Sequence, residues 1–558
     1  MKYSVFRPFP LVLLLAFLSC QPVAEQESAP VRQAPFVWEN ANVYFLLTDR
    51  FFNGDPHNDI TLGRTLETAP LRGFQGGDLK GILQKLTEGY FDSLGVNAIW
   101  FTPVVEQIHG PTDEGTGLTY GFHGYWAKDW TALDPNFGTA EDLKALVDAA
   151  HRKGIRIILD VVINHTGPVT TSDPVWPAEW VRTSPKCGFD SYANTVNCTL
   201  VDNLPDIRTE SQVPAELPPF LLDKWKQEGR YEAETAELDA FFARTGYPRT
   251  PRHHIIKWLT DFIRELGVDG FRLDTAKHTE ETVWSELRTE ADLAFREWKD
   301  AHPEAVLDTL PFYMVGEVYG YGISGGRAYS FGDRTVDFFG QGINSLINFE
   351  FKYDAQGDYE SIFVKYDSLL AGPLKGRTIL NYLSSHDDGG PFDKLRQRPL
   401  EAGTKLLLCP GGVQIYYGDE TSRPLDIPGT MGDATLRSFM NWEELAAGAS
   451  RNGHAVRDVL SHWRKLGRFR RAHPAVGAGR HTRLSEQPYL FRREFRQEGL
   501  EDVVLVGLGL PAGSKTMPAA GTFPDGALLT DYYSGLRTRV QNGIIELDTP
   551  YDTVLLGE

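Results

Sequence analysis

The sequence predicts an α/β fold: a (β/α)8 TIM barrel with an inserted subdomain after the third strand and a C-terminal antiparallel β domain. Helical segments with one apolar face end at a glycine, and a short apolar strand follows each of them directly. Eight strands can be counted, and they are apolar throughout rather than alternating, which is typical of parallel strands buried on both faces. An open, doubly wound sheet is the alternative architecture for the same pattern.

Helix and strand signals alternate along the first three quarters of the chain. An apolar stripe over residues 79–94 predicts one helix that ends at Gly95. Thr139 begins a capped helix that ends at Gly154, and the helix before the fourth strand ends at Gly267. The predicted strands lie at residues 43–47, 98–101, 155–162, 269–274, 312–318, 346–351, 378–383 and 413–417.

Changes in composition predict the domain boundaries. We assign the barrel to residues 36–165 and 251–471. Residues 166–250 between these parts are rich in Pro, Trp and Asp and too long for a plain loop, so we expect an inserted subdomain. Residues 472–558 contain short alternating runs separated by Gly, Asn and Pro, which predict a C-terminal β-sandwich.

The first 20 residues have the layout of an export signal, with two basic residues before the apolar run 11–18. That run is too short to span a bilayer as a helix. Cys20 stands where bacterial lipoprotein signals place their acylated cysteine, so a lipid anchor through Cys20 and ordinary cleavage both remain open. Either implies export, to the periplasm or as an outer-membrane lipoprotein, with residues 21–35 as a flexible linker.

The charge balance argues against nucleic acid as a partner. The chain has 75 acidic and 56 basic residues, a formal charge of -19 that repels phosphate backbones. We expect a monomer. In an oxidising compartment Cys187 and Cys198 are close enough in sequence to close a short disulfide loop, whereas Cys409 lies in an apolar run and is expected to be an inert buried thiol.

Polar and charged residues gather at the C-terminal ends of four predicted strands. In a (β/α)8 barrel these ends meet on one face, so residues far apart in the sequence would share one cleft. A single Asp at a strand end is usually a cap or turn residue, but four such strands together favour a functional site. The residues are Asp160 with Asn164 and His165, Arg272 with Asp274, Glu317, and His386 with Asp387.

These residues suit the hydrolysis of a glycosidic bond, which needs one protonated and one ionised carboxyl group beside the bond. Arg272 lies two residues before Asp274 on the same strand, so both point to one side and Arg272 would hold Asp274 ionised. Glu317 follows an apolar run and would keep its proton if its strand end is poorly solvated. A third carboxylate, Asp387, would help to raise the pKa of that acid.

Four segments resemble, in order, the signature regions of the α-amylase family, glycoside hydrolase family 13. They are residues 160–165 (DVVINH), 270–278 (GFRLDTAKH), 315–318 (VGEV) and 385–387 (SHD). Residues 204–207 (LPDI) and 123–126 (HGYW) resemble the family's additional motif and its substrate-stacking segment. Longer stretches around these segments are most similar to the periplasmic α-amylases of Gram-negative bacteria.

The resemblance implies that Asp274 is the nucleophile, Glu317 the acid/base and Asp387 the carboxylate that grips sugar hydroxyls in the transition state, with the anomeric configuration retained. Two positions depart from the pattern: Ser385 stands where Asn often precedes the His-Asp pair, and Asp388 follows it. The implied substrate-binding residues are Tyr125, Trp126, His165, Arg272, Lys277, His278 and His386.

The resemblance also implies Ca²⁺ at two places. The first site would use Asn164, Asp206 and the backbone carbonyl of His278, joining the barrel to the insert through hard oxygen ligands. An ordinary Asx-rich turn explains the residues of the second site about as well. These are Asn53, Asp55, Asn58, Asp59, Gly76 and Asp78.

Three functions follow as hypotheses. The first is a retaining α-amylase that hydrolyses α-1,4-glucosidic bonds of starch and maltodextrins, which are α-glucan polysaccharides and oligosaccharides. The second is a cyclodextrin- or maltose-acting hydrolase or glucan transglycosylase that uses the same covalent intermediate. The third is a glucan-binding protein without turnover, against which the intact set of Asp274, Glu317 and Asp387 speaks.

Overall fold

The computed structural model describes residues 35–497, 499–519 and 521–558. The predicted signal, Cys20 and nearly all of the predicted linker lie outside these residues. Within the described part of the chain, no helix is both long enough and apolar enough to cross a membrane.

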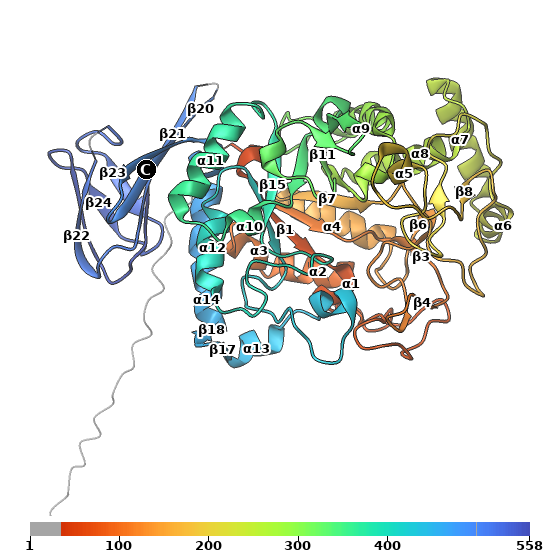
Figure 1. The fold of residues 1–558 in the computed structure, drawn as a ribbon, viewed down its shortest axis with the longest axis horizontal. Coiled ribbons are helices and arrows are strands. Elements are labelled where there is room, and N and C mark those ends of the chain that lie inside the picture. The colour runs from red at the N-terminus through yellow and green to blue at the C-terminus, as the bar shows by residue number, and fades with distance from the viewer. Residues whose placement is uncertain (1–34, 498, 520) are drawn as a thin grey trace, which may run out of the picture. The chain divides into compact units, whose positions relative to one another are not determined.

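Eight parallel strands close into a barrel, which confirms the predicted fold class (Figure 1). The order around the barrel follows the chain, and the last strand pairs with the first through Asn42 and Val413, which excludes the open sheet. Because all neighbours are parallel, the C-terminal ends of the strands form one rim. The strands are β1 (Asn42–Leu46), β2 (Ala98–Phe101), β7 (Arg156–Val161), β10 (Gly270–Leu273), β11 (Tyr313–Gly316), β14 (Ser345–Asn348), β15 (Thr378–Tyr382) and β16 (Gly412–Tyr416).

Helices surround the barrel, and their predicted ends are largely confirmed. The Thr139 capping box is formed, and α8 ends at Gly267, whose φ of 74° is the left-handed conformation that glycine adopts easily. The single helix predicted over 79–94 is wrong, because the chain turns at Gly89, φ 79°, and starts the short α3 (Tyr90–Ser93). The longer helices are α2 (Leu79–Thr87), α4 (Ala140–Arg152), α8 (Pro251–Leu266), α9 (Glu281–Ala301), α11 (Tyr359–Ala371), α12 (Pro399–Leu407) and α14 (Val456–Ala472).

The segment between β7 and α8 forms the predicted insertion. Cys187 and Cys198 are joined by a disulfide, as predicted, with a Cα–Cα distance of 5.7 Å. A backbone bridge between His165 and Asp206 ties the insertion to the end of β7. Its elements are β8 (Val181–Arg182), α5 (Tyr192–Val196), β9 (Asp206–Ile207), α6 (Pro219–Gln227) and α7 (Tyr231–Thr245).

After α14 the chain forms two antiparallel sheets, which confirms the predicted C-terminal β domain. Apolar residues of both sheets, such as Leu505 and Met517, share one core, while Phe491 and Leu555 belong to the main core of the barrel. Cys409 is fully buried, as predicted. The larger sheet has the order β19 (Arg480–Ser485), β20 (Tyr489–Gln497), β21 (Leu500–Leu508), β26 (Val554–Gly557), β23 (Leu528–Asp531) and β24 (Arg537–Arg539), and the smaller pairs β22 (Gly513–Pro518) with β25 (Ile544–Thr549).

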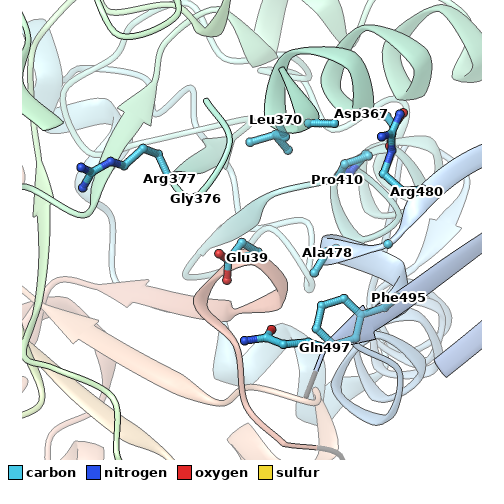
Figure 2. A pocket seen from close by; sticks show the side chains of 13 residues that line it. Glu39, Asp367, Leu370, Gly376, Arg377, Pro410, Ala478, Arg480, Phe495 and Gln497 are labelled. Atoms are coloured by element: carbon cyan, nitrogen blue, oxygen red, sulfur yellow. The ribbon is translucent and has the colours of Figure 1, made fainter. Parts of the chain in front are cut away.

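A small cavity of about 170 Å³ lies where the amino ends of the barrel strands meet the C-terminal domain (Figure 2). Glu39, ahead of β1, faces it from one side, and Phe495 and Gln497 of β20 from another. Asp367 and Arg480 form an ion pair at its edge. None of the predicted site residues lines this cavity.

Candidate active site

A cavity of about 980 Å³ opens at the C-terminal ends of the strands, where the sequence places the candidate site. Asp274, Glu317 and Asp387 all line it. Barrel topology therefore brings together three carboxylates that are up to 113 positions apart in the sequence. The predicted substrate-binding residues that also line it are Tyr125, Trp126, His165, Lys277, His278 and His386.

Arg272 contacts two of these carboxylates, Asp274 and Glu317, and also Asp160 on β7. Its side chain is 1% exposed, and its Nη1 donates to Asp274 Oδ1 at 2.7 Å and to Asp160 Oδ1 at 2.9 Å. Its Nη2 lies 2.9 Å from Glu317 Oε2. The register of β10 against β7 pairs Arg272 with Asp160, which puts these groups at one level of the barrel. One buried cation thus serves three carboxylates, so the cluster favours holding a proton.

We assign this proton to Glu317. Burial raises the pKa of Glu317 to about 8, and the charges of Asp274 and Asp387 add to the effect, although Arg272 opposes it. Burial also raises the pKa of Asp160. Asp160, however, accepts hydrogen bonds from Trp100 Nε1 at 3.0 Å and from the Tyr125 hydroxyl at 2.8 Å, and these favour its ionised form.

Asp387 lies on the loop after β15 and faces the same cavity. Its own side-chain contacts are long: Ser385 Oγ lies 3.4 Å from Oδ1 and His386 Nε2 3.6 Å from Oδ2. Burial raises the pKa of Asp387, while Arg272 and Arg437 oppose that rise. The carboxylate is therefore left free to meet a ligand.

Ring side chains cover one wall of the cavity. Tyr125 stacks on His386 with ring centroids 5.2 Å apart, and its carbonyl lies 3.1 Å from His165 Nε2. Burial lowers the pKa of both histidines, so neutral imidazoles face the cavity at neutral pH. Such a wall of flat rings and neutral hydrogen-bonding groups suits the apolar face and hydroxyls of a sugar.

The side wall nearest the insertion carries Lys277 and His278. Lys277 Nζ donates to the carbonyl of Tyr319 at 3.1 Å, and His278 Nδ1 lies 3.1 Å from the carbonyl of Thr195 on α5. Burial lowers the pKa of Lys277. The charge of Glu317 opposes this lowering of the pKa of Lys277, so Glu317 lies near Lys277 and the proton donor faces this wall.

Sequence reasoning missed a second polar group in the cavity. Asp433 accepts from Arg72 Nη2 at 3.2 Å and contacts Arg437 Nη2 at 2.5 Å. Arg437 Nε in turn donates to the carbonyl of His386 at 2.9 Å. Arg72 lies in an irregular segment after β1, and Asp433 and Arg437 lie in the short 3-10 helix η5 (Gly432–Arg437) after β16, where no repeating apolar pattern marks them. The one usable signal is the pair of oppositely charged residues Asp433 and Arg437, four positions apart, after a barrel strand.

Two residues of the first predicted cation site, Asn164 and Asp206, lie on backbone segments that pair with each other. The carbonyl of Asn164 accepts from Ile207 N at 2.8 Å, beside Asp206 on β9. Burial raises the pKa of Asp206 to about 8, and its Oδ2 lacks a hydrogen-bond partner among the described residues, although Arg182 Nε lies 2.9 Å away. A buried, half-satisfied carboxylate next to an amide side chain fits a hard divalent cation.

The six residues of the second predicted cation site fall into two groups, four that could bind a cation and two that have other partners. The side-chain oxygens of Asn53 and Asn58 are buried and, within the described residues, accept no hydrogen bond. A Cβ on Gly76, φ 88°, would come within 2.6 Å of Asp59 Oδ1 and 2.5 Å of Asn53 Nδ2, so glycine is required where the backbone passes this pair. These four residues fit an oxygen-ligated cation.

The remaining two residues of that site have other partners. Asp78 is the N-cap of α2, accepting from Gly81 N at 2.6 Å, and Asp55 pairs with Lys80 at 2.6 Å. In the described part of the chain, no three His, Cys, Asp or Glu side chains form a cluster able to hold a metal. Both candidate sites therefore depend on asparagine and backbone oxygens.

The match to a family model identifies the class of enzyme. Residues 45–476 match the family model of the α-amylase catalytic domain, so this chain belongs to the α-amylase family and is a glycoside hydrolase. It is 37% identical over 534 residues to the periplasmic α-amylase of Escherichia coli (strain K12), covering 85% of this chain and 73% of that protein.

Two more distantly related proteins are similar to this chain over most of its length. A cyclomaltodextrin glucanotransferase of Geobacillus stearothermophilus is 27% identical over 504 residues, covering 87% of this chain and 62% of that protein. The solved structure of an Anoxybacillus α-amylase is 22% identical, has a TM-score of 0.62 and covers 94% of this chain and 99% of that one, which shows a shared fold.

Proposed function

We propose that the chain is a retaining α-amylase that hydrolyses α-1,4-glucosidic bonds of starch and maltodextrins. One observation carries the proposal: Asp274 and Glu317 contact two nitrogens of one buried guanidinium, beneath a cavity that Asp387 also faces. Two carboxyl groups held this close suit retention, whereas inversion needs room between them for a water.

In the first step, ionised Asp274 attacks the anomeric carbon of the donor glucosyl unit and the glycosidic C–O bond breaks. Glu317 gives its proton to the departing oxygen, so the leaving chain departs as an alcohol. The raised pKa of about 8 keeps that proton available at neutral pH. In the second step, Glu317 takes a proton from water, the water oxygen bonds to the anomeric carbon, and Asp274 departs as a carboxylate.

The surrounding residues bind and orient the sugar. We assign Tyr125 as the stacking platform, and His165, His386 and Asp387 as partners of the hydroxyl groups of the same sugar. Trp126 lines the same wall. Lys277 and His278 lie toward Glu317, where the leaving chain must be, and would bind its glucose units. Arg272 holds the charge of Asp274 from below.

We propose Ca²⁺ at the two sites described above. Asn164, Asp206 and the carbonyl of His278 would hold the first ion, and Asn53, Asn58, Asp59 and Gly76 the second. When bound, calcium supplies charge that compensates buried oxygens and links the insertion to the barrel.

We further propose export to the periplasm, with a lipid anchor at Cys20 as one form of attachment. The support is the N-terminal signal pattern and the similarity to a relative named as periplasmic. Mass spectrometry of the mature N-terminus tests both: an uncleaved Met1 terminus would contradict export, and an unmodified terminus after cleavage would contradict the anchor.

Product analysis tests the main proposal. Wild-type protein incubated with amylose should release reducing ends as linear maltooligosaccharides, and Asp274→Asn should release almost none. The similarity to a glucanotransferase makes transfer the second candidate. Cyclic or elongated products alone would favour transfer, and binding of amylose without any product would favour the glucan-binding alternative.

A further inference from the structure

Asp388 directly follows the candidate carboxylate Asp387. It takes no part in the proposed reaction, but its side chain is buried and has three partners. It is 5% exposed. Its Oδ2 accepts from the Tyr382 hydroxyl at 2.5 Å, and its Oδ1 accepts from Gly390 N at 3.1 Å and forms an ion pair with Lys352 Nζ. Lys352 is equally buried, so the pair is closed off from water.

These partners come from fixed parts of the barrel. Tyr382 is the last residue of β15, and Lys352 lies on α10 (Phe351–Asp354), which follows β14. The loop from Ser384 to Gly390 is held at three points: Ser384 Oγ donates to Asp419 at 2.6 Å, Arg437 Nε donates to the carbonyl of His386 at 2.9 Å, and Asp388 is bound by Tyr382 and Lys352. Among the described residues the side chain of Asp387 makes only the two long contacts given above, so Asp388 is the firmly held side chain directly after it.

Asp388 also contributes charge. Although burial raises the pKa of Asp388, hydrogen bonds from Lys352 and Tyr382 hold it below its usual value, so Asp388 is ionised beside Asp387. That neighbouring charge raises the pKa of Asp387. Among the described residues, charged and titratable groups from several elements face Asp387: Arg272 on β10, Arg437 and Asp433 after β16, Glu317 and Tyr319 after β11, Tyr382 at the end of β15, and His386 and Asp388 on its own loop.

We propose that Asp388 is a positioning residue for Asp387, and that Lys352 offsets part of the charge of Asp388 at the neighbouring carboxylate. This inference rests on the proposed hydrolytic function. It assigns a role to Asp388, one of the two positions at which the sequence departs from the pattern of its family.

The two partners of the ion pair give opposite predictions. Asp388→Asn removes a negative charge next to Asp387, so the acidic limb of kcat/KM should move to lower pH by about 0.5 unit. Lys352→Met leaves Asp388 uncompensated, so the same limb should move to higher pH by a similar amount. The double variant should return close to the wild-type limb, because the net charge of the pair is again zero.

Loss of the Asp388 contacts should act on turnover. Asp388→Ala removes the contacts to Tyr382 and Lys352, and kcat on maltoheptaose should fall about 10- to 100-fold with KM within about threefold, as expected for a misplaced catalytic group. Lys365→Met is the matched control, because Lys365 of α11 pairs at 2.7 Å with Asp354 of α10, the helix that carries Lys352, and among the described residues it forms no ion pair or hydrogen bond with the loop. It should leave the pH profile unchanged.

Kinetics of these variants over pH 4 to 9, each checked by its melting temperature, test the inference. Shifts of opposite sign that cancel in the double variant support it. Shifts of the same sign, or none, in variants that melt like the wild type would overturn it, even with the wild type active. A wild type that releases no reducing ends from amylose would overturn the proposed function and this inference with it.

Discussion

Raising the pH should remove the proton on which bond cleavage depends. Burial in the cleft, together with the charges of Asp274 and Asp387, raises the pKa of Glu317 to about 8. A carboxyl group with this pKa is about nine-tenths protonated at pH 7 and about one-tenth at pH 9. If Glu317 is the acid, kcat/KM for a maltooligosaccharide should therefore fall about tenfold over this range. The direction of this change in kcat/KM is fixed, because the protonated form of Glu317 is the active one.

Glu317→Gln supplies the internal control for this prediction. The amide cannot donate the proton, so hydrolysis of maltooligosaccharides should fall by about 10²- to 10⁴-fold at pH 7. A 2,4-dinitrophenyl maltotrioside needs little protonation of its leaving oxygen, so its first step should be affected much less, and the alkaline limb should be absent in the variant. An alkaline limb that persists in Glu317→Gln would refute the assignment of the acid.

Three further predictions follow from the same structure. Asp274→Asn should lower kcat at least about a thousandfold while its melting temperature stays within a few degrees of the wild type, because charge is lost without volume; near-normal turnover would show that another residue is the nucleophile. A chelator should lower the melting temperature, and Ca²⁺ at about 100 times its Kd should restore about 2.7 kcal/mol of stability. Identical melting curves with and without the chelator would contradict calcium binding. Replacing Cys187 and Cys198 together by Ser should destabilise the protein by about 2–3 kcal/mol, since the disulfide closes a loop of sequence separation 11. Equal stability in urea denaturation would contradict that reasoning.

The barrel could be predicted because its strands are buried on both faces. Every residue of β1, β2, β7 and β16 is buried, so the apolar runs in the sequence mark the strands directly. The break at Gly89 could not be predicted from the apolar stripe, since the residues on both sides still face the core. Only the left-handed conformation of this one glycine separates α2 from α3.

The candidate site was predictable where its residues extend a strand and not where they lie in long loops. Arg272 lies on β10 and Asp274 directly follows it, as Glu317 directly follows β11, so alternation and position place them in the cleft. Arg72 reaches the same cavity from an irregular segment, and Asp433 and Arg437 reach it from the short 3-10 helix η5 (Gly432–Arg437), so their proximity depends on tertiary packing. The ion pair of Asp388 could not be predicted from the sequence either, because its partner Lys352 lies on another element.

The central claim is that Asp274 and Glu317 act on opposite sides of one bond in two successive steps. Following the anomeric proton by NMR during early hydrolysis of maltoheptaose tests it most directly. If Asp274 and Glu317 act in this way, the α-anomer of the new reducing end appears first and then mutarotates. First appearance of the β-anomer would contradict it, since a single displacement by water needs no covalent intermediate on Asp274.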